Sequence, residues 1–430
     1  TGGAPSFSIA GDGTLTVDVP ALLSGQSVRV SYDAEVADGA LISSSIINTA
    51  EIEHYDTDPE GTGDDPDDGR TYTGPTDTAQ VDTPDGSIAK TYLGSGDGNT
   101  SDALQELTIG ETVQYLLTIN IPEGTGNIEV TDALPPGLIP VGAEAQTIPA
   151  TVTSANISQG DTESSSAITL NAGARTVNFD FGTTTIAGDD DDAAVDTQII
   201  LLVEARVADV AAAADGLSLP NTATLEIFDP SNPTTPLQPP VTDTETVDIV
   251  EPELTVEKSG PIAVNPGDTV PYTVEIENIG SGPAYDIQIA DTFGATELSY
   301  NTGSITFEID GNPVLPTPSV SPSGDGFTTI VPRLLPGEIL TVEYTATLSL
   351  TAPEARSFVN SVYVNYDTVP DGNPDSPTGR DYSADDDNSV ATVPFLTKEP
   401  ISSNNIDTGD DQFDPDLIDL QIGEEVTFEL

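Results

Sequence analysis

One sequence pattern recurs several times along the chain. An opening segment that carries a lysine is followed by a glycine-acid turn and an alternating strand, as in LTIGETVQYLLTI and VNPGDTVPYTVEI. A later strand carries an asparagine, as in INTAEIEHYD, PNTATLEIFD and VNSVYVNYD. Short strands of alternating polarity between Gly, Pro, Asn and Asp turns are typical of β-sandwiches. The sequence therefore predicts an all-β chain of tandem sandwiches.

The repeat divides the chain into four segments, which we predict to be immunoglobulin-like β-sandwich domains in a linear array. Residues 1–86 hold the C-terminal half of one domain with an acidic junction loop, 87–251 a complete domain with a long insertion at 142–200, 252–395 a second complete domain, and 396–430 the N-terminal strands of a further domain. Residues 204–216 fit either a helix or a strand followed by a loop.

Both ends of the chain fall inside a sandwich on these boundaries. Each end would leave unpaired strand edges and half a core. We expect either a longer chain that continues in both directions, or a subunit whose residues 396–430 complete residues 1–86 of the next copy. The motif TDALPPGL at 131–138 has no counterpart in either end segment, which favours the longer chain.

Acidic residues dominate the charge, with 73 Asp and Glu against 10 Lys and Arg and a formal net charge of −63. Such a surface repels nucleic acid and anionic membranes, and it attracts divalent cations. The chain has no Cys, Met or Trp, and no apolar run is long enough to span a membrane. We therefore expect an extracellular or cell-surface protein without disulfides, in which any covalent stapling uses other chemistry.

The order of a lysine, a GDTV-like strand, VTDALPPGL and NTATL resembles the "domain of unknown function eleven" repeats of bacterial and archaeal surface proteins. It is also similar to the isopeptide-forming domain of fimbrial proteins. The resemblance covers nearly the whole chain, although IADTFGATEL replaces the Pro-Pro-Gly turn in the third segment. It implies a stalk, filament or adhesin that contacts neighbouring copies or repeats of the same protein.

All three lysines of the chain occupy the same place, in the opening segment of a domain: Lys90, Lys258 and Lys398. Asparagines recur in the later strands at Asn48, Asn221 and Asn360, and a carboxylate recurs between them at Asp132 and Asp291. In the fimbrial domains that the sequence resembles, residues of this order form an intramolecular isopeptide bond. The resemblance thus implies Lys–Asn cross-links assisted by the two aspartates, and burial would favour the neutral amine and protonated acid that the reaction needs.

A simpler interpretation of the same residues stays open. A lysine in a strand at a domain junction can pair with acids of the neighbouring domain. An asparagine that opens a strand can cap a turn. Intact mass separates the two interpretations, because each isopeptide bond releases one ammonia.

Acidic loops at 55–77 and 366–387 follow two of the asparagine strands, and we predict that both lie at domain junctions. Calcium takes about six to eight oxygen ligands, many of them carboxylates. The candidate ligands are Asp56, Asp58, Asp64, Asp65, Asp67, Asp68 and Asp77 in the first loop, and Asp367, Asp371, Asp375, Asp381, Asp385 and Asp387 in the second. The alternative is that these acids serve only hydration and solubility.

No catalytic constellation stands out in the sequence. The one histidine, His54, lies in an alternating strand, where a surface residue is more common than a catalytic one. No glycine-rich phosphate loop joins a strand to a helix. A zinc site is excluded because the chain has no cysteine and only one histidine as ligands. We therefore expect a non-enzymatic structural segment of a secreted, repetitive surface fibre, with calcium as its cofactor. The alternative function is an adhesin stalk or binding module that recognises a host or environmental surface or a carbohydrate.

Overall fold

The chain folds into β-strands and turns throughout the part that the structure describes. The computed structural model covers residues 4–37, 39–57, 70–95, 104–187, 198–323, 326–353, 355–373, 376–393, 399–403 and 426–429. These ranges contain no helix, and hence none that could cross a membrane. The predicted all-β class with tandem immunoglobulin-like sandwiches is confirmed. The chain forms two compact units, one of residues Thr1–Leu93, Gln114–Ala205 and Pro220–Thr246, the other of Gly94–Val113, Arg206–Leu219 and Val247–Leu430.

The described residues of the first segment form three separate two-stranded antiparallel sheets. They pair β1 (Ser6–Ile9) with β2 (Leu15–Asp18), β3 (Ser45–Glu51) with β6 (Thr76–Asp82), and β4 (Tyr55–Asp56) with β5 (Thr71–Tyr72). Two-stranded sheets bury little apolar surface, and side chains such as Phe7 and Ile47 are largely exposed. Ile42 is fully buried, because it packs near Gly126 of the second sandwich.

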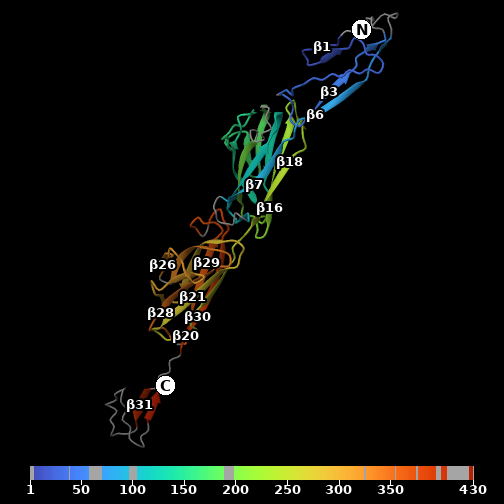
Figure 1. Cartoon of the computed structure of the whole chain (residues 1–430). Coiled ribbons are helices and arrows are strands. Elements are labelled where there is room, and N and C mark those ends of the chain that lie inside the picture. Colours follow the sequence, from blue (N-terminus) through green and yellow to red (C-terminus); the bar gives the residue numbers. More distant parts are fainter. Residues whose placement is uncertain are drawn as a thin grey trace. The chain divides into compact units, whose positions relative to one another are not determined.

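The second sandwich has two sheets, drawn mainly in teal to yellow-green in Figure 1. The smaller sheet, in the order β11-β15-β9-β7, contains β7 (Ser87–Ser95), β9 (Thr112–Asn120), β11 (Leu138–Thr147) and β15 (Gln198–Val207). The larger, in the order β12-β14-β10-β16-β18-β8, contains β8 (Glu106–Leu107), β10 (Gly124–Ala133), β12 (Val152–Ser154), β14 (Thr176–Ile186), β16 (Ser218–Asp229) and β18 (Val241–Ile249), with β13 (Ile168–Asn171) on β14 and β17 (Asn232–Pro236) on β16. In β9 every second side chain is buried, as expected for strands that face a core on one side.

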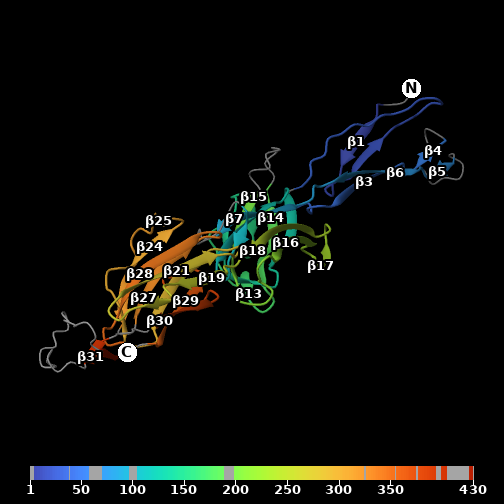
Figure 2. The ribbon, with the colours of Figure 1, turned by 90° about the horizontal axis from the view of Figure 1, so that it is seen from below.

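The third sandwich repeats this plan. One sheet, in the order β19-β21-β28-β24-β25, contains β19 (Leu254–Ser259), β21 (Thr269–Asn278), β24 (Thr306–Ile309), β25 (Asn312–Pro313) and β28 (Ile339–Leu348), with β23 (Leu298–Tyr300) also on β28. The other, in the order β20-β30-β29-β22-β27-β26, contains β20 (Ala263–Val264), β22 (Ala284–Phe293), β26 (Val320–Ser323), β27 (Gly326–Leu334), β29 (Ser357–Asp367) and β30 (Tyr382–Thr392). Figure 2 shows β24 and β25 on the side of β28 away from β21, with β24 next to β28. Residues such as Ile276 and Ile289 bring both sheets into one core. In the last segment, β31 (Glu399–Ser403) pairs with β32 (Val426–Glu429).

The strand that carries the asparagine is not the last strand of its sandwich. Residues 382–392, predicted as part of a loop, form β30 and pair with β29 over ten consecutive residues. In the same way β18 continues the sheet beside β16. The prediction that 366–387 is a loop preceding the next domain was therefore wrong. Only residues 368–381 connect the two strands, and acids at alternate positions of β30 stand on its exposed face.

The segment 142–200 differs from the predicted insertion, because most of its described part is sheet. It contains β12, β13 and β14, and β14 pairs with β10 along the whole of β10. In the third sandwich β27 holds the same place beside β22. The segment is thus an integral part of the sandwich. Residues 204–216 continue β15 and then turn, so the strand-and-loop alternative is the one observed.

Candidate functional site: a buried lysine, aspartate and asparagine in each sandwich

Lys90, Asp132 and Asn221 meet in the core of the second sandwich. Lys90 comes from β7 of the smaller sheet, whereas Asp132 on β10 and Asn221 on β16 belong to the facing sheet. The Lys90 Nζ donates to Asp132 Oδ1, and the Asn221 Nδ2 donates to Asp132 Oδ2 over 3.1 Å. The side chains of Lys90 and Asp132 are inaccessible to solvent. The Lys90 Nζ lies 4.4 Å from the centre of the Tyr115 ring.

The third sandwich repeats the arrangement with Lys258 on β19, Asp291 on β22 and Asn360 on β29. The Lys258 Nζ donates to Asp291 Oδ2 and, over 2.6 Å, to the Tyr344 hydroxyl. That hydroxyl donates to Asp291 Oδ2 over 2.5 Å and accepts from the Asn360 Nδ2 over 2.8 Å. The Lys258 Nζ also lies 5.3 Å from the ring centre of Tyr272. Both sandwiches thus bury a lysine among a carboxylate, an amide and aromatic rings.

Strand register accounts for this arrangement. β10 and β16 pair antiparallel with Asp132 opposite Ala223, so Asn221 lies two residues further along the neighbouring strand and on the same face. β22 and β29 repeat the same offset between Asp291 and Asn360. The lysines point inward because they occupy buried positions of the alternating strands β7 and β19.

Burial shifts both lysine–aspartate pairs toward their neutral forms. Desolvation lowers the pKa of Lys90 and of Lys258, although the attraction of the neighbouring carboxylate opposes this shift. Desolvation also raises the pKa of Asp132 and of Asp291 against the opposing attraction of the lysine. Both directions favour a neutral amine beside a protonated acid. Burial likewise raises the pKa of Tyr272, to about 12.

The two asparagine carbonyls have an unusual environment. Asn221 Oδ1 and Asn360 Oδ1 are buried and have no hydrogen-bond partner. A buried unpaired carbonyl is costly, by about 1–3 kcal/mol. A half-turn of the Asn221 amide would bring its oxygen to Asp132 Oδ2, where a protonated acid would donate to it. This arrangement would polarise the asparagine carbonyl toward attack by a neutral amine.

The end segments bring together fewer of the predicted cross-link residues. Asn48 lies on the exposed strand β3, where its Nδ2 donates to the Tyr32 hydroxyl. Tyr32 in VSY holds the place that Tyr344 holds in VEY, so the amide–tyrosine contact of the third sandwich recurs here. Lys398 lies outside the described residues. Cross-links of Asn48 and Lys398 therefore stay predictions.

The loop between β29 and β30 contacts the turn between β8 and β9, and both belong to the same compact unit. Thr108 Oγ1 donates to the Thr368 carbonyl over 2.9 Å, and Thr368 Oγ1 donates to the Ile109 carbonyl over 2.7 Å. Gly110 has a φ of 88°, and a Cβ at this position would lie 2.4 Å from the Thr378 carbonyl oxygen. The close approach and the left-handed backbone both require glycine. The loop thus packs against Thr108, Ile109 and Gly110 of its own compact unit.

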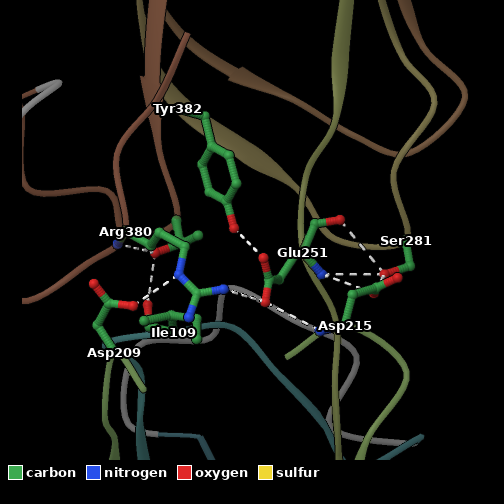
Figure 3. A network of polar contacts seen from close by, with 8 residues as sticks. Ile109, Asp209, Asp215, Glu251, Ser281, Arg380 and Tyr382 are labelled. Atoms are coloured by element: carbon green, nitrogen blue, oxygen red, sulfur yellow. Dashed lines mark hydrogen bonds and ion pairs between the residues drawn. The ribbon is translucent and has the colours of Figure 1, made fainter. Parts of the chain in front are cut away.

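Arg380 lies at the centre of a polar network in this unit (Figure 3). Its Nε donates to Asp209 Oδ1 over 2.8 Å, and its Nη1 donates to Glu251 Oε1 over 2.6 Å. Glu251 also accepts from the Tyr382 hydroxyl and from the backbone N–H of Asp215. Within this unit the network therefore joins Glu251 to the connection after β15, to the loop at 368–381 and to β30.

Buried carboxylates hold the shape of the loop at 368–381. Asp367 is fully buried and accepts the backbone N–H groups of Val369 and Ser376, each over 2.9 Å. Asp286 accepts a further backbone N–H of the loop over 2.7 Å. Desolvation, together with a hydrogen bond to Asp381, raises the pKa of Asp367 to about 7. The loop is thus ordered by direct hydrogen bonds to protein carboxylates.

The acids predicted as calcium ligands do not converge in the described ranges. Asp56 lies in β4, Asp77 in β6, Asp367 at the end of β29, Asp371 and Asp381 in the following loop, and Asp385 and Asp387 on β30. Among described residues, no three His, Cys, Asp or Glu side chains could hold one metal ion. The other candidates, Asp58, Asp64, Asp65, Asp67, Asp68 and Asp375, lie outside the described residues. The described acids of the second loop do not fit a calcium site, and calcium stays a prediction.

Comparisons with known proteins return surface domains at low similarity. No protein-family model and no curated protein sequence match the chain. Among solved structures, the Streptococcus pneumoniae pilus backbone RrgB matches with a TM-score of 0.23 and 16% identity, over 28% of this chain and 54% of that one, so the chain spans about half of it. The collagen-binding subdomain of the Enterococcus faecalis surface protein ACE gives 0.24 and 18%, over 32% and 95%. The C-terminal fragment of the Streptococcus agalactiae major pilin gives 0.27 and 11%, over 70% and 91%.

The tyrosines that line both sites were not predicted from the sequence. Tyr115 and Tyr272 occupy the same inward position in TVQY and TVPY, directly after the glycine-acid turn. That recurrence is a signal that could have been found. Tyr344 was harder to anticipate, because the second sandwich has Ala205 at the corresponding position.

Proposed function

We propose that the chain is a structural segment of a secreted, repetitive cell-surface fibre whose sandwiches are locked by Lys–Asn isopeptide bonds. One observation carries the proposal: two successive sandwiches bury the same three groups, and in each the lysine comes from the opening strand and the asparagine from a late strand of the facing sheet. The ion pairs of Arg380 with Asp209 and Glu251 stabilise the loops of the unit that contains the third sandwich. The expected partners are neighbouring repeats or copies of the same protein.

The proposed chemistry uses the neutral forms that burial favours. The lysine Nζ, as a free amine, attacks the asparagine Cγ while the protonated aspartate donates to the asparagine oxygen. The aspartate then relays a proton from the attacking nitrogen to the asparagine Nδ2. The Cγ–Nδ2 bond breaks, ammonia leaves, and an amide joins Nζ to Cγ. The aspartate ends in the state in which it began, so no other reactant is needed.

Intact mass tests the proposal. We expect the full chain to be lighter than its sequence by two ammonia, one from Lys90–Asn221 and one from Lys258–Asn360. Protease digestion should release two branched peptides that join these residues. Asp132→Ala and Asp291→Ala should each restore the mass of one ammonia, because each removes the proton relay of one site. A folded wild-type chain with the mass of its plain sequence would contradict the cross-links.

We also propose calcium binding for the acidic loop at 55–77, on the grounds of its composition. The described acids of the other loop are bonded within the protein or spread along a strand. Calorimetric titration of the full chain with calcium should therefore show binding that disappears when Asp64, Asp65, Asp67 and Asp68 are replaced together by asparagine. Replacing the exposed Asp385 and Asp387 by asparagine is the matched control and should leave it unchanged. Absence of heat in the wild-type chain would leave hydration as the role of these acids.

A further inference from the structure

A second carboxylate contacts each reactive lysine residue, at its main chain. The backbone N–H of Lys90 donates to Asp243 Oδ2 over 2.7 Å, and that of Lys258 donates to Asp386 Oδ2 over 2.6 Å. Neither aspartate belongs to the buried site described above. The two contacts are equivalent, since each joins the opening strand to the last strand of the same sandwich.

These hydrogen bonds cross between the two sheets of each sandwich. β7 and β19 are the edge strands of their sheets, whereas β18 and β30 lie in the facing sheets. A strand edge offers backbone N–H groups that no neighbouring strand accepts. Asp243 and Asp386 supply acceptors at the one residue of each edge strand that bears the reactive amine. They therefore tie the lysine main chain to the sheet that carries the aspartate and asparagine of the site.

The position of the two aspartates is set by register. Each stands four residues before a buried valine of the last strand, Val247 in one sandwich and Val390 in the other. In the first segment Asp77 stands four residues before Val81. Asp77 and Asp243 also both accept the N–H of the threonine that follows them. The acid thus recurs in all three last strands.

From this geometry we infer that Asp243 and Asp386 are positioning residues for the proposed cross-links. Each carboxylate fixes the position of its lysine relative to the facing sheet, so that the Nζ reaches the asparagine Cγ. A slip of one residue would turn the lysine away from the core, and a slip of two would move it by roughly 7 Å. The inference rests on the proposed isopeptide function.

The same carboxylates also act on the charge of the lysine. The charged or titratable groups that face Lys258 are Asp291 on β22, Asp386 on β30, Tyr344 on β28 and Tyr272 on β21. Asp386 raises the pKa of Lys258, against the larger effect of desolvation. For Lys90 the facing groups are Asp132, Asp243, Glu245 and Tyr115. Removing the charge of Asp386 should therefore make the free amine available at lower pH.

The test separates the two effects of the carboxylate with two variants. Asp386→Ala removes the acceptor and the charge, whereas the Asp386→Asn oxygen can still accept the Lys258 N–H. The full chain is purified in denaturant from inclusion bodies and then diluted into folding buffers from acid to alkaline pH. Branched peptide and ammonia loss are then followed by mass spectrometry. Asp385→Ala, at the exposed neighbouring position of β30, is the matched control.

We expect Asp386→Ala to slow cross-linking in the third sandwich by about tenfold to a hundredfold, because small misplacements of reacting groups have effects of this size. Asp386→Asn should react at least as fast as the wild type and shift its pH profile to lower pH, which a merely structural role would not do. Formation of the Lys90–Asn221 bond in the same molecule is an internal control. Asp243→Ala should reverse the pattern between the sandwiches.

Two results would overturn the inference, and they differ. If the wild type and Asp386→Ala cross-link at the same rate, the positioning role is wrong while the isopeptide function stands. If the folded wild type loses no ammonia, both fail. Folding of each variant is checked by its calorimetric transition. The exchange rate of the Lys258 amide hydrogen reports the lost hydrogen bond, and it should rise in Asp386→Ala and stay slow in Asp385→Ala.

Discussion

A Lys258→Met chain should retain the Lys90–Asn221 bond and release one ammonia instead of two. Its third sandwich should be much less stable. The substitution leaves the buried Asp291 carboxyl without the nitrogen that contacts it, which costs about 1–3 kcal/mol. A covalent link that closes a loop of about 100 residues stabilises by a further ~4–5 kcal/mol on the chain-entropy model. Asp291 can take up a proton once the lysine is gone, which offsets part of this loss. We therefore expect the calorimetric transition of this sandwich to fall by about 10–20 °C.

The control for this substitution lies next to it. Glu257 is exposed on the same strand, and Glu257→Gln should leave the transition within a few degrees of the wild type. Lys90→Met should lower the transition of the second sandwich and leave that of the third unchanged. Equal transitions for Lys258→Met and wild type would show that Lys258 neither cross-links nor stabilises the core.

The unit that contains the third sandwich should lose stability as the pH rises from about 4 to about 7. The pKa of Asp367 is about 7 in the folded chain against 3.8 for an unperturbed aspartate. Between these values the folded state holds a proton that the unfolded state has released, so the free energy of unfolding falls with rising pH. At about 1.4 kcal/mol for each pKa unit, the loss is at most about 4 kcal/mol. Below pH 4 and above pH 7 this group contributes no slope.

Denaturant unfolding between pH 4 and 8 measures this dependence, and Asp381→Asn isolates the contribution of Asp367. The asparagine amide can donate to the Asp367 carboxylate, so the variant needs no shared proton and should show a shallower decline. The raised pKa values of Asp132 and Asp291 contribute in the same direction to both chains and cancel in the difference. Identical slopes in the two chains would mean that the proton is not held at Asp367.

The alternating strands and their turns were predictable because buried and exposed positions of a strand alternate, and apolar and polar residues alternate with them in the sequence. The meeting of Lys258, Asp291 and Asn360 could be anticipated because three lysines and their companion residues recur in register. The roles of Asp386 and Arg380 could not, because their contacts depend on which strands face each other across the sandwich. Among 73 acids, a single register-equivalent aspartate carries too little signal to stand out.

The placement of β30 after the asparagine strand has a mechanical consequence. If tension enters the third sandwich at Lys258 and leaves after Thr392, a bond from Lys258 to Asn360 shields everything between those two residues from extension. The segment from Asn360 to the end of β30 stays outside that bypass, and it is held by the pairing of β29 with β22 and of β30 with β29. Pulling out its roughly 30 residues would lengthen the chain by roughly 100 Å, whereas unfolding a sandwich without the bond would lengthen it several times more. Each sandwich would then be a rigid body with a short, reversible extensible element at its C-terminal side.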